Sequence, residues 1–421
     1  MIGEWGLENR IWKQGAKFMK RQFLLIMIAV IAAEMIFAAE PEFSGVFDST
    51  ANYTLGAGDA QEHSFGIEEF ANLRLRMRTG DRASFFSSFN FIALSGNFLE
   101  NADNAAEYRN SLLQTPFVNG QNYSAAVELE RLYFRVNGNY IDTEMGLLRI
   151  PFGYGDIWGS TDFLNPKNPL LLNARPRAVL GMNFSCYPVD SLKLMAFAAA
   201  PQDPLETEGY GFLSGISLDQ HWDRVSLQAL YSYEAPRYYD DNDFIDSDFG
   251  IHRFGLSFKS DMELGLVADI LYTLNPVNLE GIEGLSTALG FDYSFLGGDL
   301  FILMQYLVSG YASSTAFGYG GSWRNKHYLY ETVRYRFTDF FSISLSMVNC
   351  FDDYSFTPFA ALEYEFFQGF SANLTARIPL DQSIMNGGRE GELGPLPLHL
   401  EGTPQEQGAR FILNAGVRLR F

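Results

Sequence analysis

Arginine residues recur at every second position in two parts of the chain. The five residues are Arg74, Arg76, Arg78, Arg418 and Arg420. Because side chains alternate between the two faces of a β-strand, each set would lie on one face. A row of guanidinium groups attracts and guides anions without catalysing a reaction. The spacing therefore indicates a basic, water-facing surface built on β-strands.

A catalytic site would instead need a nucleophile and a base within reach of each other. The chain has five histidines, which are His63, His221, His252, His327 and His399. No serine or aspartate motif accompanies them, and no spacing of ligands matches a zinc site. We therefore expect no enzyme, no catalytic residue, no metal ion and no cofactor.

The end of the chain shows which kind of element carries these arginines. From Phe411 to Phe421 every second residue is apolar, and mostly polar residues stand between them. A strand with this pattern has one apolar face and one polar face. In a membrane β-barrel, about 9–11 such residues cross the bilayer. One such strand also fits a soluble sheet, so the number of similar strands decides the fold class.

The same alternation returns throughout residues 40–421, and turn signals such as Asn137-Gly138 interrupt it. The expected strands are 43–56, 71–78, 83–93, 124–137, 141–151, 177–188, 191–200, 209–219, 223–234, 249–259, 262–273, 285–295, 299–309, 325–337, 340–350, 356–367, 370–379 and 409–421. Short turns alternate with long loops along this series. The sequence therefore predicts an all-β fold, a transmembrane antiparallel β-barrel of about 18 strands (16–18).

Composition agrees with a membrane barrel. The 421 residues include 39 glycines, and 15% of them are aromatic while only 19% are charged. No apolar run of about 18 residues follows residue 40, so only a closed barrel could cross a bilayer there. The net charge of −20 disfavours nucleic acid as a partner.

Residues 1–39 have the pattern of an N-terminal extension and a secretory signal peptide. Met19, Lys20 and Arg21 precede an apolar run, and Ala38-Ala39 offers a cleavage site of small residues. The alternative is a single anchoring helix, although the apolar run is interrupted early by Glu34. Translation could start at Met1 or at Met19. Residues 40–421 form the expected barrel.

The cost of burying charge decides which face of the barrel carries the arginines. An arginine in contact with lipid costs roughly 2–4 kcal/mol at the bilayer midplane. All five together would cost about 5–10 kcal/mol, as much as the stability of a typical domain. The arginines are therefore expected to line the pore as one basic wall. An arrangement with Leu75 and Leu419 packed inside would contradict the barrel interpretation.

The final strand, which ends at Phe421, resembles the C-terminal signature of Gram-negative outer-membrane β-barrels, and the whole pattern is similar to the porin-like family. This resemblance implies the cell outer membrane, contact with its lipid and lipopolysaccharide, and recognition of the last strand by the barrel insertion machinery. It also implies short periplasmic turns and long extracellular loops, and it leaves a homotrimer open.

The stretch that departs most from the alternating strand pattern is Gly146–Leu170, which contains glycines, aromatic residues and two Asn-Pro pairs. Its aromatic side chains are expected to pack in the barrel lumen, and the stretch resembles the third loop of general porins, which folds inward. We expect loop 152–176 to be a constriction, with Arg149, Asp156, Trp158 and Asp162 as its functional residues. Alternatively, Asp162 caps a turn and Arg149 pairs with an acidic residue of a neighbouring strand.

Acidic residues gather in residues 235–248, and five aspartates lie between positions 240 and 248. Several carboxylates can bind Ca²⁺, but the glycine of a helix-loop-helix calcium site is missing. The other interpretation is a solvated loop that divalent ions bridge to lipopolysaccharide.

Two function classes remain. The first is an outer-membrane porin for passive diffusion of small hydrophilic solutes, with some anion preference from the arginines. The second is a surface-exposed adhesin or structural barrel with no open channel. A transporter for sugars or fatty acids lies between them, but no residue identifies such a ligand.

Overall fold

The computed structural model describes residues 40–56, 63–80, 82–96, 114–120, 122–165, 178–200, 212–235, 250–274, 284–310, 326–380 and 409–421, together with residues 176 and 393. The predicted signal region 1–39 and the acidic segment 240–248 lie outside these residues. Within the described ranges, no helix has the length and apolar character needed to cross a membrane.

Nearly all described residues belong to antiparallel strands. The strands are β1 (Glu40–Gly56), β2 (His63–Thr79), β3 (Ala83–Gly96), β4 (Gln114–Gly120), β5 (Tyr123–Asn137), β6 (Ile141–Leu148), β7 (Val179–Val189), β8 (Leu192–Ala200), β9 (Leu213–Trp222), β10 (Val225–Glu234), β11 (Ile251–Asp261), β12 (Gly265–Leu274), β13 (Leu285–Phe295), β14 (Leu300–Ser309), β15 (His327–Thr338), β16 (Phe341–Cys350), β17 (Ser355–Phe367), β18 (Phe370–Arg377) and β19 (Ala409–Arg420). A one-turn 3-10 helix, η4 (Leu296–Gly298), connects β13 to β14.

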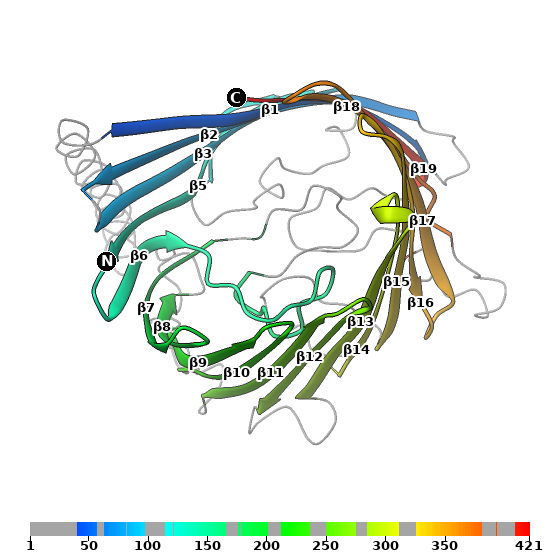
Figure 1. Cartoon of the computed structure of the whole chain (residues 1–421). Helices are drawn as coiled ribbons and strands as arrows, with labels where there is room; N and C mark the ends of the chain where they lie inside the picture. The colour runs from blue at the N-terminus through cyan, green and yellow to red at the C-terminus, as the bar shows by residue number, and fades with distance from the viewer. Residues whose placement is uncertain are drawn as a thin grey trace, which may run out of the picture.

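The strands close into a barrel. Apart from β4, each strand pairs with the wall strands before and after it in the sequence, and β1 pairs with both β2 and β19 (Figure 1). Backbone hydrogen bonds between Gly45 and Phe421 extend this closure to the last residue. Strand β3 pairs directly with β5, so β4 is an addition and the barrel wall has 18 strands. The predicted fold class and strand number are confirmed.

Strand β4 was missed in the sequence, where residues 96–123 were expected to be a loop. It pairs with Tyr123–Glu128 on β5, whereas β6 pairs only with Leu132–Asn137. Strand β6 ends at Leu148 and not at the predicted residue 151, because Ile150 and Phe152 leave the β6 ladder and are buried in an apolar cluster against inward side chains of β8 and β9. The early end of β6 leaves part of the β5 edge for β4.

The inner face of the barrel can be traced from one contact. The connection after β6 lies inside the ring of strands (Figure 1), and its backbone binds Asp269 of β12. Following the paired residues around the ring places Asn72 and Arg74 on the same inner face. Leu73 and Leu419 lie on the outer face and are 44% and 40% exposed. The arrangement that would have contradicted a barrel is therefore not found.

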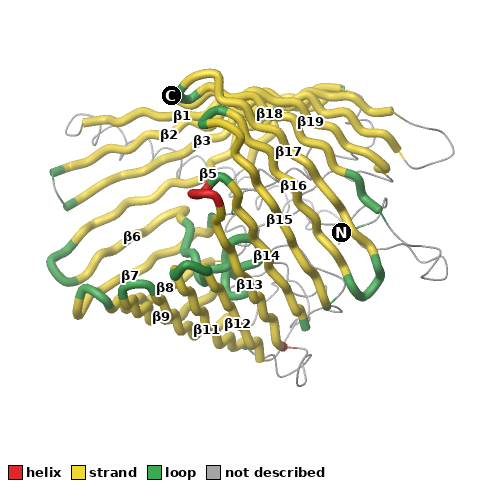
Figure 2. The backbone as a smooth tube through the Cα atoms, turned by 45° about the vertical axis from the view of Figure 1, so that its right-hand side comes forward, coloured by secondary structure: helices red, strands yellow, loops and turns green. Residues whose placement is uncertain are grey.

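The strands cross the wall obliquely, and short turns such as those between β5 and β6 and between β7 and β8 lie side by side at one rim (Figure 2). The connections at the other rim include the one between β6 and β7, which carries the candidate site. A barrel of this kind has room for a second layer of chain inside it.

Candidate functional site

Residues 149–165, here called the inner segment, form a layer of chain against the inside of the barrel. At its start, Ile150 and Phe152 are almost fully buried in a cluster with inward side chains of β8 and β9. The ring centroids of Phe152 and Phe197 are 4.9 Å apart. The aromatic residues of this stretch pack as apolar side chains do when a wall is available to cover them.

Polar side chains of the wall bind the backbone of the inner segment. Gln228 of β10 accepts the N–H of Gly153 at 2.7 Å, and Asp269 of β12 accepts the N–H groups of Tyr154 and Gly155 at 3.1 and 2.9 Å. Asp269 is fully buried. A buried polar group is stable only when it is hydrogen-bonded, so these side chains and the inner segment satisfy each other.

The far end of the inner segment reaches β14 and β15. The side-chain amide of Gln305 donates to the carbonyl oxygen of Trp158 at 2.7 Å and accepts the N–H of Ile157 at 2.9 Å. Trp158 is buried, and its ring meets that of Tyr330 edge to face at 6.3 Å between centroids. The aromatic ring therefore fixes the end of the segment furthest from β6.

The chain then returns along the same wall. Thr161 hydrogen-bonds Ser257 of β11 at 3.0 Å, and the guanidinium of Arg253 lies 4.9 Å from the ring centroid of Phe163. Arg253 also forms a buried ion pair with Glu234 at 2.7 Å. The inner face of β7–β15, here called the covered wall, is thus the part of the barrel that the inner segment contacts.

Gly153 fits a position that other residues would not fit. Its φ of +80° lies in the left-handed region, and an added Cβ would collide with the side chains of Thr161 and Asp269.

Burial beside Asp219 and Asp269 raises the pKa of Tyr154 to about 12. Tyr154 therefore contributes a neutral hydroxyl to the segment at every physiological pH.

The predicted residues of this loop lie as follows. Trp158 is buried at the far end, and Asp156 is exposed on the inner segment. Asp162 accepts the N–H of Asn165 at 3.2 Å, and Arg149 donates to Glu130 of β5 at 2.7 Å. The contact of Asp162 is the turn cap, and that of Arg149 is the ion pair with a neighbouring strand, that the sequence offered as the alternative to a constriction role.

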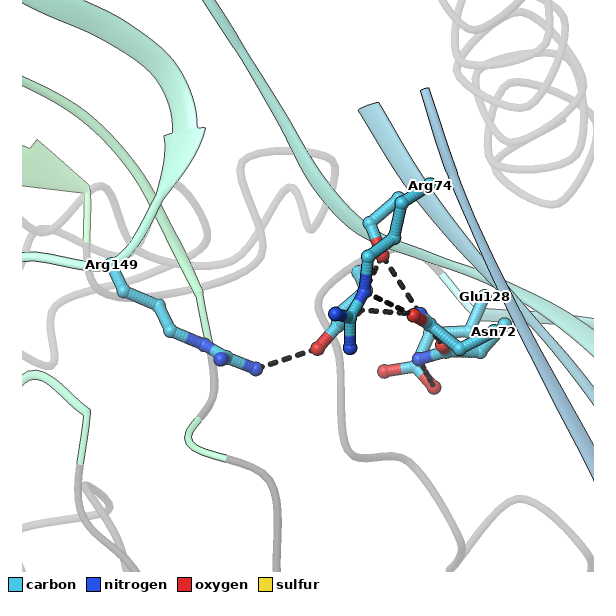
Figure 3. A network of polar contacts seen from close by, with 7 residues as sticks. Asn72, Arg74, Glu128 and Arg149 are labelled. Carbon is cyan, nitrogen blue, oxygen red and sulfur yellow. Dashed lines mark hydrogen bonds and ion pairs between the residues drawn. The ribbon is translucent and has the colours of Figure 1, made fainter. Parts of the chain in front are cut away.

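The Arg149 ion pair belongs to a network on β2, β3 and β5 (Figure 3). The Asn72 amide donates to Ser88, Asn90 and Glu130, at 2.6–2.9 Å. Arg74 donates to the Asn72 side-chain oxygen at 2.6 Å. This network connects the start of the inner segment with β5, the wall strand next to β6, and with the adjoining strands β3 and β2.

A β-bulge makes the network possible. Ser88 pairs with Arg131 and Phe89 with Leu129, so Glu130 is the extra residue of β5. The bulge turns two successive side chains inward, because Glu130 binds Ser88 while Arg131 lies 4.6 Å over the ring of Phe86. Glu130 could not be predicted from the sequence, since strict alternation cannot place both Glu130 and Arg131 on one face.

The inner faces of β19, β1 and β2, here called the seam, carry the predicted pore-lining arginines. The structure brings acidic residues of β1 between them. Arg418 donates to Asp48 at 2.7 Å, and Arg78 lies 3.6 Å from Glu42. Asp48 and Glu42 are not among the predicted residues, although the same alternation applied to residues 40–48 places them on the inner face.

The other arginines of the seam keep contact with solvent. Arg74, Arg76 and Arg420 are exposed although they lie on the inner side of a closed barrel. Arg76 faces Glu42 in the register, and Arg420 faces Val46. The seam is therefore a hydrated surface of both signs of charge.

A second contact with the inner wall comes from the connection between β18 and β19. Leu393 is buried, donates its N–H to Ser355 at 2.9 Å and accepts the hydroxyl of Thr357 at 2.9 Å. It lies in the same apolar cluster as Trp158. No sequence pattern predicts this contact, since residues 380–408 carry no strand signal and are expected to be a loop.

No family model and no curated protein matches this chain. Solved structures do. A BenF-like porin from Pseudomonas fluorescens Pf-5 aligns with a TM-score of 0.57 and 7% identity, over 91% of this chain and 98% of that one. The chain has the porin fold.

Two further porin-fold structures match at 10% identity and a TM-score of 0.52. They are OccAB3 of Acinetobacter baumannii, which aligns over 91% of this chain and 99% of its own, and OccK8 (OprE) of Pseudomonas aeruginosa, over 91% and 98%. The resemblance to porin-like outer-membrane barrels drawn from the final strand is confirmed at the level of the fold.

Proposed function

We propose that the chain is a porin of the Gram-negative outer membrane, through which small hydrophilic solutes diffuse passively without an enzymatic reaction. One observation carries this proposal. Arg74 and Arg76 are exposed on the inner face of a closed barrel whose outer face exposes Leu73 and Leu419. Charged side chains stay exposed inside a barrel only when water fills it, and apolar side chains on the outside suit lipid.

The inner segment is the constriction in this proposal. Because it lies on the covered wall, it narrows the lumen from one side and leaves the passage between itself and the seam. Asp156 and the seam arginines then face the passage from opposite sides. Opposed charges across a narrow pore select among polar solutes.

Selectivity for anions follows from the seam but is moderated by its acids. The charges of Arg418 and Arg78 are offset by Asp48 and Glu42, whereas Arg74 donates to the neutral side-chain amide of Asn72. We propose a modest anion preference that depends on Arg74, Arg76 and Arg420. Salt should weaken this preference because the groups are hydrated.

The partners in this proposal follow from the membrane setting. The outer face contacts lipid and lipopolysaccharide, and the insertion machinery binds the last strand with its terminal Phe421. Residues 1–39 are removed as a signal peptide, and the homotrimer of general porins is the oligomeric state to test by cross-linking in detergent.

Planar-bilayer recording tests the function and the constriction together. The wild-type chain is compared with a variant that lacks Gly153–Asn165. We expect stepwise channels, with a larger conductance and faster solute uptake into liposomes for the deletion. Equal conductance of both proteins would disprove the constriction. Silence of both proteins would favour the adhesin or structural barrel.

A further inference from the structure

Three Tyr–His pairs repeat on the outer face of the barrel. The pairs are Tyr53–His63, Tyr231–His252 and Tyr306–His327. The tyrosine oxygen lies 2.5, 3.0 and 2.6 Å from the histidine Nδ1 in the three pairs, in that order. The rings stack with centroids 5.8, 6.2 and 6.1 Å apart. Three of the five histidines of the chain therefore have the same local geometry.

The three pairs also occupy the same place in the barrel. Each tyrosine stands three residues before the end of its strand, and each histidine is the first or second residue of the next strand. The strands are β1 and β2, β10 and β11, and β14 and β15. All three hairpins join at the rim opposite the short turns, so the Tyr–His pairs belong to one rim of the barrel.

The register shows that this rim position is on the outside. Each tyrosine lies directly across from an apolar residue of an adjacent strand. For Tyr53 and Tyr231 this is the following strand, and for Tyr306 it is the preceding strand. These residues are Phe65, Phe254 and Leu289, and they are 52%, 48% and 49% exposed. The Tyr–His pairs thus lie where the apolar outer surface ends and the connections to the next strands begin.

The chemistry of a pair suits a bilayer surface. Tyrosine and histidine present an apolar ring body with polar atoms at one end, which favours the boundary between hydrocarbon and water. The phenol is the stronger donor, so we assign the tyrosine O–H as donor to Nδ1. A neutral imidazole that accepts at Nδ1 carries its proton at Nε2, and this N–H is then a donor at the rim.

We propose that the three Tyr–His pairs bind the phosphate groups of glycolipids in the outer leaflet of the membrane. Phosphate oxygens are strong acceptors for N–H donors, and the pairs present such donors at headgroup depth. The occupant has to be lipid because the apolar residues beside the pairs are exposed on the lipid-facing side. This inference rests on the proposed location in the outer membrane, but not on channel activity.

The test uses the full chain in detergent micelles and native mass spectrometry. The probes are lipid A with two phosphates and the same lipid after removal of both. The wild-type protein should bind the phosphorylated lipid at least about tenfold more tightly, as expected for hydrogen bonds to a charged group. Substituting His63→Phe, His252→Phe and His327→Phe together should remove most of this difference, because phenylalanine keeps an aromatic ring but has no N–H donor.

The matched control is His221→Phe. His221 lies at the short-turn rim with Ser226 at 2.9 Å from Nδ1, so its replacement should leave the preference unchanged. Replacing the three tyrosines by phenylalanine keeps the ring bodies and should reduce the preference, because the imidazoles lose the group that fixes their tautomer. Wild-type affinity in the tyrosine variant would disprove the pairing.

Two outcomes would overturn the inference outright. One is equal binding of both lipids by the wild-type protein, and the other is an unchanged preference in the triple histidine variant. Conductance recorded on the same proteins separates this result from the proposed function. A barrel that conducts no ions but still prefers the phosphorylated lipid would contradict the proposed channel function and leave the proposed lipid site supported.

Discussion

The covered wall and the seam are built from the same alternating strands, yet their polar residues behave differently. On the covered wall, Asp269 and Gln305 are fully or almost fully buried and bind backbone groups of the inner segment. On the seam, Arg418 pairs with a residue of the adjacent strand while Arg76 is exposed. The difference lies in what covers each wall. Polar inward residues of the covered wall bind the inner segment, whereas exposed polar inward residues of the seam face water.

Polar residues of the covered wall should affect the stability of the fold, whereas those of the seam should affect the electrostatic field in the pore. Buried groups that bind the inner segment would be left without partners if the segment detached, which is costly. Exposed charges on the seam are already solvated, so losing one changes stability little but changes the field in the pore. We therefore expect stability effects to concentrate on the covered wall and selectivity effects on the seam.

The largest expected effect is that of Asp269→Ala. This substitution removes the acceptor for the N–H groups of Tyr154 and Gly155 and should lower the free energy of unfolding by about 2–4 kcal/mol. Loosening of the inner segment should also raise the single-channel conductance. Urea unfolding in lipid vesicles and bilayer recording measure the two effects.

The control for this prediction is Asp299→Asn. Asp299 pairs with Arg336 at 2.9 Å, but both side chains are about half exposed and lie near a short turn. The stability change should stay below about 1 kcal/mol and the conductance should not change. Similar effects of both substitutions would mean that the inner segment adds nothing specific to the covered wall.

An intermediate effect is expected from the Arg418–Asp48 pair of the seam. Both side chains are partly buried, with 24% and 20% exposure, so Asp48→Asn should cost about 1–2 kcal/mol. A double-mutant cycle with Arg418→Gln should give a coupling energy of this size. The more exposed pair Arg78–Glu42, at 3.6 Å, should give less than about 0.5 kcal/mol in the same cycle.

The smallest effect on stability is expected for the double substitution Arg74→Gln and Arg76→Gln. Exposed side chains of this kind change stability by about 0.5 kcal/mol each. The reversal potential in a salt gradient should shift toward cations, because the seam keeps its acids. Arg224→Gln removes one positive charge at the turn after β9, away from the seam, and should leave the reversal potential unchanged. An equal shift in the control would place selectivity outside the seam.

The sequence determined the strands, the barrel and its faces. Alternation between Leu73 and Arg74 or between Leu419 and Arg420 is a local pattern with the period of a β-strand, and the cost of a charge in lipid fixes which face is outside. The acids of β1 were readable by the same rule. Had residues 40–48 been read with this alternation, the seam would have been predicted as a surface of mixed charge.

Only the tertiary structure decided where the inner segment lies and what it binds. The hydrogen bond between Asp269 and Gly155 joins residues 114 positions apart, and the one between Gln305 and Trp158 joins residues 147 apart. No local pattern encodes such partners, because the wall position that faces a loop is set only when the barrel closes. The bulge at Glu130 and the contact of Leu393 with Ser355 were likewise not predictable from local sequence, since each depends on which chain fills the space inside the closed ring.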